Sequence, residues 1–332
     1  GQLAQQEAAA MVPALALSPM AHHRVLDLCA APGGKTLQLL DMMMQSLTPH
    51  DSSTRSGGGE GPQRPTRGAP SPLASGILVS NDVCAARQER TLRRARCQAC
   101  VPLVVTACDG RHFPELEFVG AAPDVPPNPV LFDRILVDAP CSGDGTLRKS
   151  PDKWARWSSR PGLVMHRQQL ELLRRGCASL AHGGLLVYAT CSLDPLQCEA
   201  VVCAALEAGG GAFELVPPSE LLLAPLEQGL RYQPGKRSWK VPHPDFRDNR
   251  RLLRTFAEAP LECTREESEP GRRLFSSMFA PEETIEPIRD PCLERCMRIL
   301  PSAGAMAGCG GFFVATLRRT LPYVPPRGLE VT

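Results

Sequence analysis

The stretch DRILVDAPCSGDG (133–145) joins a short apolar run to a turn-forming segment that carries Cys141. The stretch GGLLVYATCSLDP (183–195) repeats this arrangement and carries Cys191 directly after its own apolar run. Each run is rich in Val, Leu and Ile and bounded by Gly or Pro, which predicts a buried strand of a parallel sheet. We therefore expect both thiols at the carboxyl ends of strands, where open α/β sheets bind ligands.

The two cysteines admit two interpretations. A free cysteine is often buried for packing alone, which is the ordinary explanation of any single one. If the two strands are neighbours, however, their backbones lie about 4.8 Å apart, and two thiols can reach one substrate group. The matching places of Cys141 and Cys191 at two strand ends favour a shared site.

Apolar runs alternate with helical patterns along the rest of the chain. The expected strands cover residues 24–29, 76–82, 102–109, 134–138, 184–190, 212–216 and 310–319. The expected helices cover residues 6–17, 36–45, 84–97, 164–181, 196–207 and 292–300. This alternation predicts an α/β fold with a seven-stranded, mostly parallel sheet and helices on both faces.

The domain organisation follows from composition. We expect a helical lead-in over residues 1–23, one domain over 24–319 and a tail over 320–332. Residues 51–73 hold Gly, Pro, Ser and Arg with almost no apolar side chain, which predicts a disordered insertion. Residues 218–290 are irregular, with scattered basic and aromatic side chains, and we expect them to face the substrate.

Composition excludes several classes of protein. The 332 residues, of which 43% are hydrophobic, suffice for a sizeable core, and the net charge of +2 does not require a nucleic-acid partner. The 14 cysteines lack the spacing of a disulfide framework, which favours reduced thiols in an intracellular protein. No apolar run approaches the ~20 residues of a membrane span. Because the sequence begins at Gly1, we expect a piece of a longer protein.

Three smaller patterns each have a bland and a functional interpretation. Cys97 and Cys100 form one CxxC pair, but no second pair follows at zinc-finger spacing, and we expect no metal. RQERTLRRAR (87–96) predicts a helix with a basic face, which is either solvated or in contact with phosphate. Trp154 and Trp157 favour a core-facing stripe, with base stacking as the alternative.

The segment DLCAAPGGKT (27–36) joins the first strand to a helix through a glycine-rich turn. Such a turn presents backbone N–H groups and lets a ligand approach closely. A P-loop would need glycine where Cys29 stands, and the dinucleotide fingerprint GxGxxG is absent. The turn therefore predicts a small-cofactor loop of another type.

Acidic residues stand at four successive strand ends: Asp27, Asp82, Asp109 and Asp138. In a doubly wound sheet these ends line one crevice, and a carboxylate after the second strand can hold ribose hydroxyls. A solvated loop carboxylate is the alternative for any single one. Their recurrence at four strand ends favours cofactor binding.

Five motifs together resemble the ordered motif series of the Sun/Nop-type RNA cytosine-5 methyltransferases. They are CAAPGGKT, SND, DAPCSGDGTLRKSPD, YATCSLDP and GGFFVATL. The resemblance runs from about Gln6 to Arg319, and the paired PCSGDG and TCSL motifs are highly specific to that family. Further segments resemble its eukaryotic tRNA-methylating branch: TLRKSPDKWARW, RSWKV, RRLFSSMFAP and LERCMRILP.

The resemblance implies a Rossmann-like methyltransferase fold that uses S-adenosylmethionine, with residues 24–319 as the catalytic domain. It implies that Asp82 holds the ribose, that Asp109 lies beside the adenine, and that Asp138 lies near the cofactor and the target base. Val83 and Cys84 follow Asp82 where relatives can carry an acidic residue. The residues matched to the methionine end of the cofactor are Cys29, Ala30, Ala31, Pro32, Gly33, Gly34 and Lys35.

The resemblance also assigns roles to the two cysteines. Cys191 matches the nucleophile of the family, and Cys141 matches its second cysteine, which is linked to product release. A thiolate that adds to carbon 6 of cytosine makes carbon 5 nucleophilic, so the thiol needs a lowered pKa. Asp138 can hydrogen-bond the ring edge of the base. Lys35 is either an electrostatic helper or a structural lysine.

The expected partner is RNA, with tRNA favoured over rRNA or mRNA. The target base must leave its stack, and Arg148, Lys149, Lys153 and the arginines of 87–96 are candidate phosphate contacts. We expect a monomer in the nucleus or nucleolus, without a metal or membrane partner, and with RNA specificity carried in part by a preceding region.

Three rival functions differ in sequence. A DNA cytosine methyltransferase needs one cysteine in another Pro-Cys context, and an amino-methylating enzyme needs Asn/Asp-Pro-Pro-aromatic where this chain has Asp138-Ala139-Pro140-Cys141. A catalytically silent RNA-binding scaffold has no need of intact cofactor and cysteine motifs. The sequence therefore favours the RNA cytosine-5 methyltransferase.

Overall fold

A computed structural model describes most of the chain. The described residues are 6–47, 75–95, 101–118, 128–245, 251–269, 271–281, 292–301 and 308–323. The expected disordered insertion (51–73), the Cys97–Cys100 pair and residues 324–332 of the expected tail lie outside them. Within the described residues, no helix is both long and apolar enough to cross a membrane.

The centre of the fold is a nine-stranded sheet in the order β3-β2-β1-β6-β7-β13-β12-β9, with β8 paired to β13. The strands from β3 to β7 run parallel, and β13 returns antiparallel to β7. The parallel strands are β1 (Arg24–Asp27), β2 (Ile77–Asn81), β3 (Leu103–Thr106), β6 (Phe132–Asp138) and β7 (Leu180–Thr190). The others are β8 (Phe213–Leu215), β9 (Gln233–Pro234), β12 (Met297–Ile299) and β13 (Phe312–Arg319).

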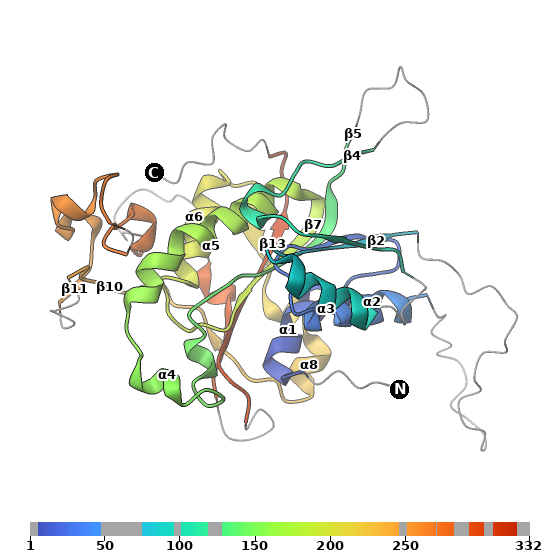
Figure 1. The fold of residues 1–332 in the computed structure, drawn as a ribbon, viewed down its shortest axis with the longest axis horizontal. Helices are drawn as coiled ribbons and strands as arrows, with labels where there is room; N and C mark the ends of the chain where they lie inside the picture. The colour runs from blue at the N-terminus through green and yellow to red at the C-terminus, as the bar shows by residue number, and fades with distance from the viewer. Residues whose placement is uncertain are drawn as a thin grey trace, which may run out of the picture.

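Helices cover both faces of this sheet, as the alternating sequence pattern predicts (Figure 1). On β6, Ile135 and Val137 pack with α5 and α6, whereas Leu136 points to the core beneath α1 and α2. Each fully buried aliphatic side chain of this kind contributes roughly 1.5–3 kcal/mol. The helices are α1 (Ala8–Leu17), α2 (Gly34–Gln45), α3 (Ala85–Ala95), α4 (Asp152–Ala155), α5 (Arg160–Ser179), α6 (Glu199–Ala208), α7 (Pro218–Leu221) and α8 (Leu223–Glu227).

All seven expected strands are present, but the sheet has two more, and one helix prediction is wrong. Residues 292–300 form a short 3-10 turn (η6, Leu293–Arg295) followed by β12. Met297 pairs with Val314 of β13, and Arg298 reaches a buried carboxylate on α6. These contacts with residues distant in sequence override the helical pattern of the segment.

The expected end of the long helix also differs. The helix α5 ends at Ser179, and the predicted stop at Gly183 and Gly184 lies inside β7 instead. Gly183 has a φ of +73°, and the pairing of β6 with β7 shifts register nearby, between Phe132 and Arg134. The glycine pair therefore bends a strand rather than ending a helix.

The remaining described elements are short. The described residues between 218 and 281 form only short helices, strands and 3-10 turns, of which η5 packs on α6. The two small hairpins are β4 (Glu117–Phe118) with β5 (Asn128–Pro129), and β10 (Val241–Pro242) with β11 (Leu252–Leu253). The other 3-10 turns are η1 (Gly110–His112), η2 (Asp144–Thr146), η3 (Phe256–Glu258), η4 (Leu261–Cys263) and η5 (Ser276–Met278).

Candidate active site

Cys141 and Cys191 meet at the carboxyl edge of the sheet. The strands that precede them, β6 and β7, are parallel neighbours, with Asp138 opposite Ala189, so this expectation is confirmed. The two Sγ atoms lie 3.1 Å apart, within the range of a thiol hydrogen bond. We call residues 139–146 and 191–197 the cysteine loops.

Glycines bring the cysteine loops into backbone contact. The N–H of Gly145 donates to the carbonyl of Cys191 at 2.9 Å, and the N–H of Gly311 donates to the carbonyl of Gly145 at 2.6 Å. A Cβ atom on Gly145 would lie only 2.4 Å from the carbonyl oxygen of Gly311. Any side chain at this position would therefore push the loops apart.

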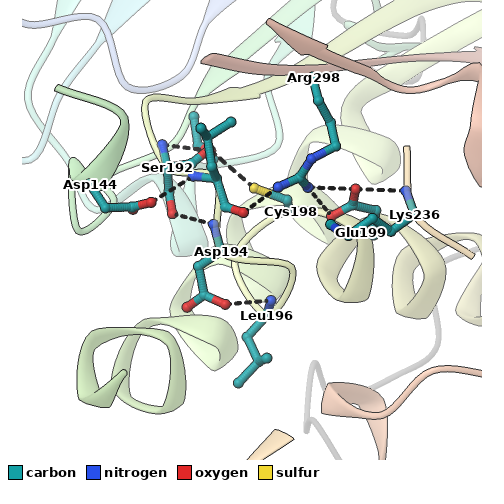
Figure 2. A network of polar contacts seen from close by, with 10 residues as sticks. Asp144, Ser192, Asp194, Leu196, Cys198, Glu199, Lys236 and Arg298 are labelled. Carbon is teal, nitrogen blue, oxygen red and sulfur yellow. Dashed lines mark hydrogen bonds and ion pairs between the residues drawn. The ribbon is translucent and has the colours of Figure 1, made fainter. Parts of the chain in front are cut away.

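Side chains then fix the orientation of both cysteine loops. Asp144 accepts a hydrogen bond from the N–H of Leu193 at 2.9 Å, and Figure 2 shows this carboxylate pointing at the turn after β7. The N–H of Ser142 donates to Oε1 of Gln197 at 2.9 Å, and Nε2 of Gln197 donates back to Oγ of Ser142 at 3.0 Å. The loops therefore act as one unit, although no local sequence pattern joins them.

A buried ion pair supports the second cysteine loop from behind. Nη1 of Arg298 lies 2.7 and 2.8 Å from the two carboxylate oxygens of Glu199, and both side chains are almost fully buried. The other end of the Arg298 guanidinium donates to the carbonyl of Leu193 (Figure 2). Sequence reasoning missed this pair because its members are 99 residues apart.

The pKa values of the two thiols are shifted in opposite directions. The hydrogen bond from Cys141 lowers the pKa of the Cys191 thiol, and the positive charges of Lys153 and Lys35 act in the same direction against burial and the charge of Asp138. The same hydrogen bond, together with burial, raises the pKa of the Cys141 thiol. Cys191 is therefore the thiol of the pair that ionises more readily, and Cys141 is the one that keeps its proton more readily.

Lys35 is part of the site rather than a solvated side chain. Its Nζ atom lies 2.6 Å from Oδ2 of Asp138, and its side chain is only 12% exposed. The same ammonium group lies 5.1 Å from the ring centroid of Phe312 at the start of β13. The pair of Lys35 and Asp138 thus joins the glycine-rich turn to the cysteine loops.

Residues 29–35, which we call the cofactor turn, are held by the side chain of Asp82, directly after β2, and by side chains of α3. The carboxylate of Asp82 accepts from the N–H of Ala31 at 3.1 Å. Gly33 has a φ of +91°, and a Cβ atom there would lie 2.6 Å from Oγ1 of Thr91. Close packing against α3 therefore requires glycine at this position.

The basic helix α3 has a role that neither interpretation of its arginines included. Arg87 donates to the carbonyl of Ala31 at 2.5 Å, and Arg94 donates to the carbonyl of Pro32 at 3.2 Å. Arg93 instead pairs with Glu89 on the helix surface. Arg87 and Arg94, which lie about two helical turns apart on α3, therefore both bind the cofactor turn directly.

The strand-end carboxylates fall into two groups. Asp27 is wholly buried, accepts from Oγ1 of Thr36 at 2.7 Å, and burial raises its pKa to about 7. Asp109 lies beside η1, where hydrogen bonds from Arg111 lower its pKa. Asp27 thus supports the turn from beneath, whereas Asp82, Asp109 and Asp138 surround it.

The prediction that Trp154 and Trp157 face the core is wrong. Their side chains are 68% and 62% exposed. The helix α4 is only four residues long, so it has no apolar face that could be laid against the sheet. Trp157 instead lines a pocket beside the cysteine loops.

Lys153 was predicted only as a phosphate contact. Its Nζ atom donates to the carbonyl of Gly143 at 3.3 Å and to Oγ1 of Thr146 at 3.2 Å. It therefore lies over the first cysteine loop, where its charge acts on Cys191. Among the described residues, no group of three His, Cys, Asp or Glu side chains is arranged to hold a metal ion.

Comparison with known proteins identifies the class. The model of the 16S rRNA methyltransferase RsmB/F family matches residues 73–238, and the chain belongs to this family. A solved structure described as NSun6 from Pyrococcus horikoshii with SFG has a TM-score of 0.54 at 18% identity, covering 96% of this chain and 53% of that one. The expected Rossmann-like methyltransferase fold is thus confirmed.

Particular relatives are more similar in sequence. The multisite-specific tRNA:(cytosine-C(5))-methyltransferase trm4b of Schizosaccharomyces pombe is 36% identical over 329 residues, 97% of this chain and 43% of the relative. The tRNA (cytosine(34)-C(5))-methyltransferase of Drosophila melanogaster is 35% identical over 326 residues, 97% of this chain and 38% of the relative. The chain therefore spans about two-fifths of the length of these relatives.

Proposed function

We propose that this chain transfers a methyl group from S-adenosylmethionine to carbon 5 of cytosine in RNA, with tRNA as the substrate. The observation that carries the proposal is the pair of Cys141 and Cys191, 3.1 Å apart at the ends of adjacent parallel strands. A methyltransferase acting on a nitrogen atom has no use for two thiols of opposite acidity. The tRNA substrate is supported by the two relatives, which are named as tRNA cytosine-C(5) methyltransferases.

The residues around the cofactor turn fit S-adenosylmethionine. Burial, together with the negative charges of Asp27, Asp138, Asp82 and Asp109, raises the pKa of the Cys29 thiol, so the turn lies in a negative environment that suits a sulfonium cation. Asp82 uses one lone pair of each oxygen on backbone N–H groups and keeps others for ribose hydroxyls. Asp109, which caps η1 after β3, would accept a hydrogen bond from the adenine amine.

The bound cofactor would supply an electrophilic methyl group, and the chain supplies the nucleophile that activates the base. The Cys191 thiolate adds to carbon 6 of the cytosine, and the electrons of the ring double bond move toward carbon 5. Asp138, held by Lys35 at 2.6 Å, would accept a hydrogen bond from the exocyclic amine of the ring. The pair fixes the carboxylate before the base arrives.

Cys141 serves the second half of the reaction. Once carbon 5 is methylated, water takes its proton, the C5=C6 double bond re-forms, and the bond between carbon 6 and Sγ of Cys191 breaks so that Cys191 leaves as a thiolate. The Cys141 thiol, which stays protonated because its pKa is raised, donates its hydrogen bond to the departing Cys191 thiolate. The raised pKa of the Cys141 thiol, rather than the 3.1 Å contact itself, is the reason to assign Cys141 as the donor of this hydrogen bond.

The test is methyl transfer to tRNA transcripts, read as 5-methylcytosine by nucleoside mass spectrometry. We expect product with the unaltered chain and none with Cys191→Ala. The control is Cys203→Ala, which removes a buried thiol on α6 outside the site. A Cys191→Ala protein that methylates at the rate of the Cys203→Ala protein contradicts the proposal. If 5-methylcytosine forms in rRNA transcripts but not in tRNA transcripts, the proposed substrate is wrong and rRNA takes its place.

A further inference from the structure

A pocket of about 630 Å³ lies beside the cysteine loops, and the chemistry described above does not use it. It is bounded by the two loops, by the segment that follows α4, and by the strand β10. In Figure 1, α4 stands apart from the helices that cover the sheet. Its volume lies in the range of sites that enclose small molecules.

The pocket shares a wall with the cysteine pair. Ser142 and Asp144, which follow Cys141 directly, line the pocket, but neither Cys141 nor Cys191 is among its described lining residues. Lys153 also lines it and reaches back to the carbonyl of Gly143. A ligand there would therefore contact the loop that carries Cys141, at Ser142 and Asp144.

The lining of the pocket combines one indole ring with several positively charged side chains. Trp157 is 62% exposed, and Lys153, Arg156 and Lys240 bring three cations. The two lining carboxylates are engaged within the chain: Asp144 by Leu193, and Asp194 by Leu196. Burial also raises the pKa of Asp194 to about 6, which weakens its charge further.

An exposed indole beside several cations matches the chemistry of a nucleotide. Indole rings stack on the face of any base, and lysine and arginine pair with phosphate. A peptide or a small acid would use the cations but leave the indole without a partner. The combination therefore favours a nucleotide over other anionic ligands.

We propose that this pocket binds the nucleotide next to the target cytosine in the RNA, with its base stacked on Trp157 and its phosphate held by Lys153, Arg156 and Lys240. The inference rests on the proposed function, since adjacency has meaning only if the cysteine pair holds a cytosine. It extends that function by assigning a second subsite, which makes the enzyme sensitive to the strand flanking its target.

The test uses Trp157→Ala with Trp154→Ala as the matched control. Both tryptophans are exposed and lie three residues apart, but only Trp157 lines the pocket. With a short RNA that contains the target cytosine, we expect Trp157→Ala to weaken RNA binding about 5- to 150-fold, as expected for loss of one stacked base. Trp154→Ala should stay within about twofold of the unaltered chain, and Trp157→Phe should retain most of the affinity.

The second arm places an abasic site at each position flanking the target. One of the two should weaken binding to the unaltered chain as much as Trp157→Ala does, and should cost the Trp157→Ala protein nothing more. Equal losses for the two tryptophan variants, or additive losses from the abasic site and Trp157→Ala, would overturn the pocket while the proposed function stands. Absence of 5-methylcytosine with the unaltered chain would overturn the proposed function and the pocket with it.

Discussion

The cysteine loops and the cofactor turn lie at the same edge of one sheet but are held by different means. Backbone hydrogen bonds between Gly145, Cys191 and Gly311 fix the cysteine loops, with a buried ion pair behind them. The cofactor turn is held by the side chains of Asp82, directly after β2, and of Arg87 on α3. Backbone hydrogen bonds thus join the two cysteine loops to each other, in addition to the side chains of Asp144 and Gln197, whereas the cofactor turn is joined to α3 by arginine side chains alone among the bonds described.

The largest expected effect concerns the ion pair behind the cysteine loops. Arg298→Met leaves the Glu199 carboxylate, which is wholly buried, without its cation. We expect the free energy of unfolding to fall by about 3–5 kcal/mol, measured by urea denaturation. The double variant Arg298→Met, Glu199→Leu should recover most of that loss.

Arg318→Met is the control for this prediction, since it removes a pair with partly exposed Glu214 and Glu220. Its loss should stay below about 1 kcal/mol. If the two arginine variants lose the same stability, the cysteine loops are not supported from behind as described.

A second prediction concerns Asp27 beneath the cofactor turn. The folded protein raises its pKa from 3.8 to about 7, so its ionisation makes folding less favourable as the pH rises through that window. Asp27→Asn removes this penalty and can still accept from Thr36. The variant should gain about 2 kcal/mol more stability at pH 8 than at pH 5, measured by denaturation at both values.

Asp109→Asn is the control, because the pKa of Asp109 is shifted in the opposite direction from that of Asp27. Hydrogen bonds from Arg111 lower the pKa of this carboxyl, so its contribution is complete above the unfolded pKa and is lost only in acid. The change in stability should therefore be the same at pH 5 and pH 8. A gain for Asp27→Asn that does not depend on pH would contradict the assignment of a buried, protonatable carboxyl.

The arginine contacts of the cofactor turn give a smaller effect. Arg87→Met removes a hydrogen bond to the carbonyl of Ala31 and a charge 3.6 Å from Asp82. We expect the affinity for S-adenosylmethionine, measured by calorimetric titration, to fall about 3- to 10-fold. Arg93→Met, which loses only the surface pair with Glu89, should bind as the unaltered chain does; an equal fall in both would mean that α3 acts through its overall charge.

The smallest expected effect is on the acidity of the nucleophile. Lys153 favours the thiolate of Cys191, so Lys153→Met raises that pKa and moves the acidic limb of the pH–rate profile to higher pH. At saturating RNA, adduct formation at neutral pH should slow by less than about tenfold and recover as the pH rises. Arg265→Met, at an exposed position, should leave the profile in place; a uniform loss at every pH would argue against tuning by Lys153.

The parallel half of the fold follows from local sequence patterns. Apolar runs that end in a cysteine or aspartate predict buried strands with functional groups at their carboxyl ends, and Cys141, Cys191 and Asp138 meet there. Such patterns carry no information on pairings distant in sequence. The strand β12 was missed because Arg298 and Met297 are held by α6 and β13, not by their neighbours.

The three-residue spacing of two tryptophans also led to a wrong prediction, because the helix near them is short. Trp154 and Trp157 have the interval of a core-facing stripe, but α4 ends at Ala155, so both indoles remain exposed. For α3 the basic pattern was predicted correctly, but it did not indicate the two specific contacts that its arginines make with the carbonyls of Ala31 and Pro32. Roles that depend on which backbone atom lies opposite a side chain become visible only in three dimensions.

The central claim, that one cysteine attacks and the other releases, is tested most directly by Cys141→Ala. Incubated with S-adenosylmethionine and substrate RNA, this variant should accumulate a covalent protein–RNA complex that survives denaturing electrophoresis. The double variant Cys141→Ala, Cys191→Ala should form none. A complex that persists without Cys191, or a Cys141→Ala protein that turns over normally with no complex, would contradict the division of labour between the two thiols.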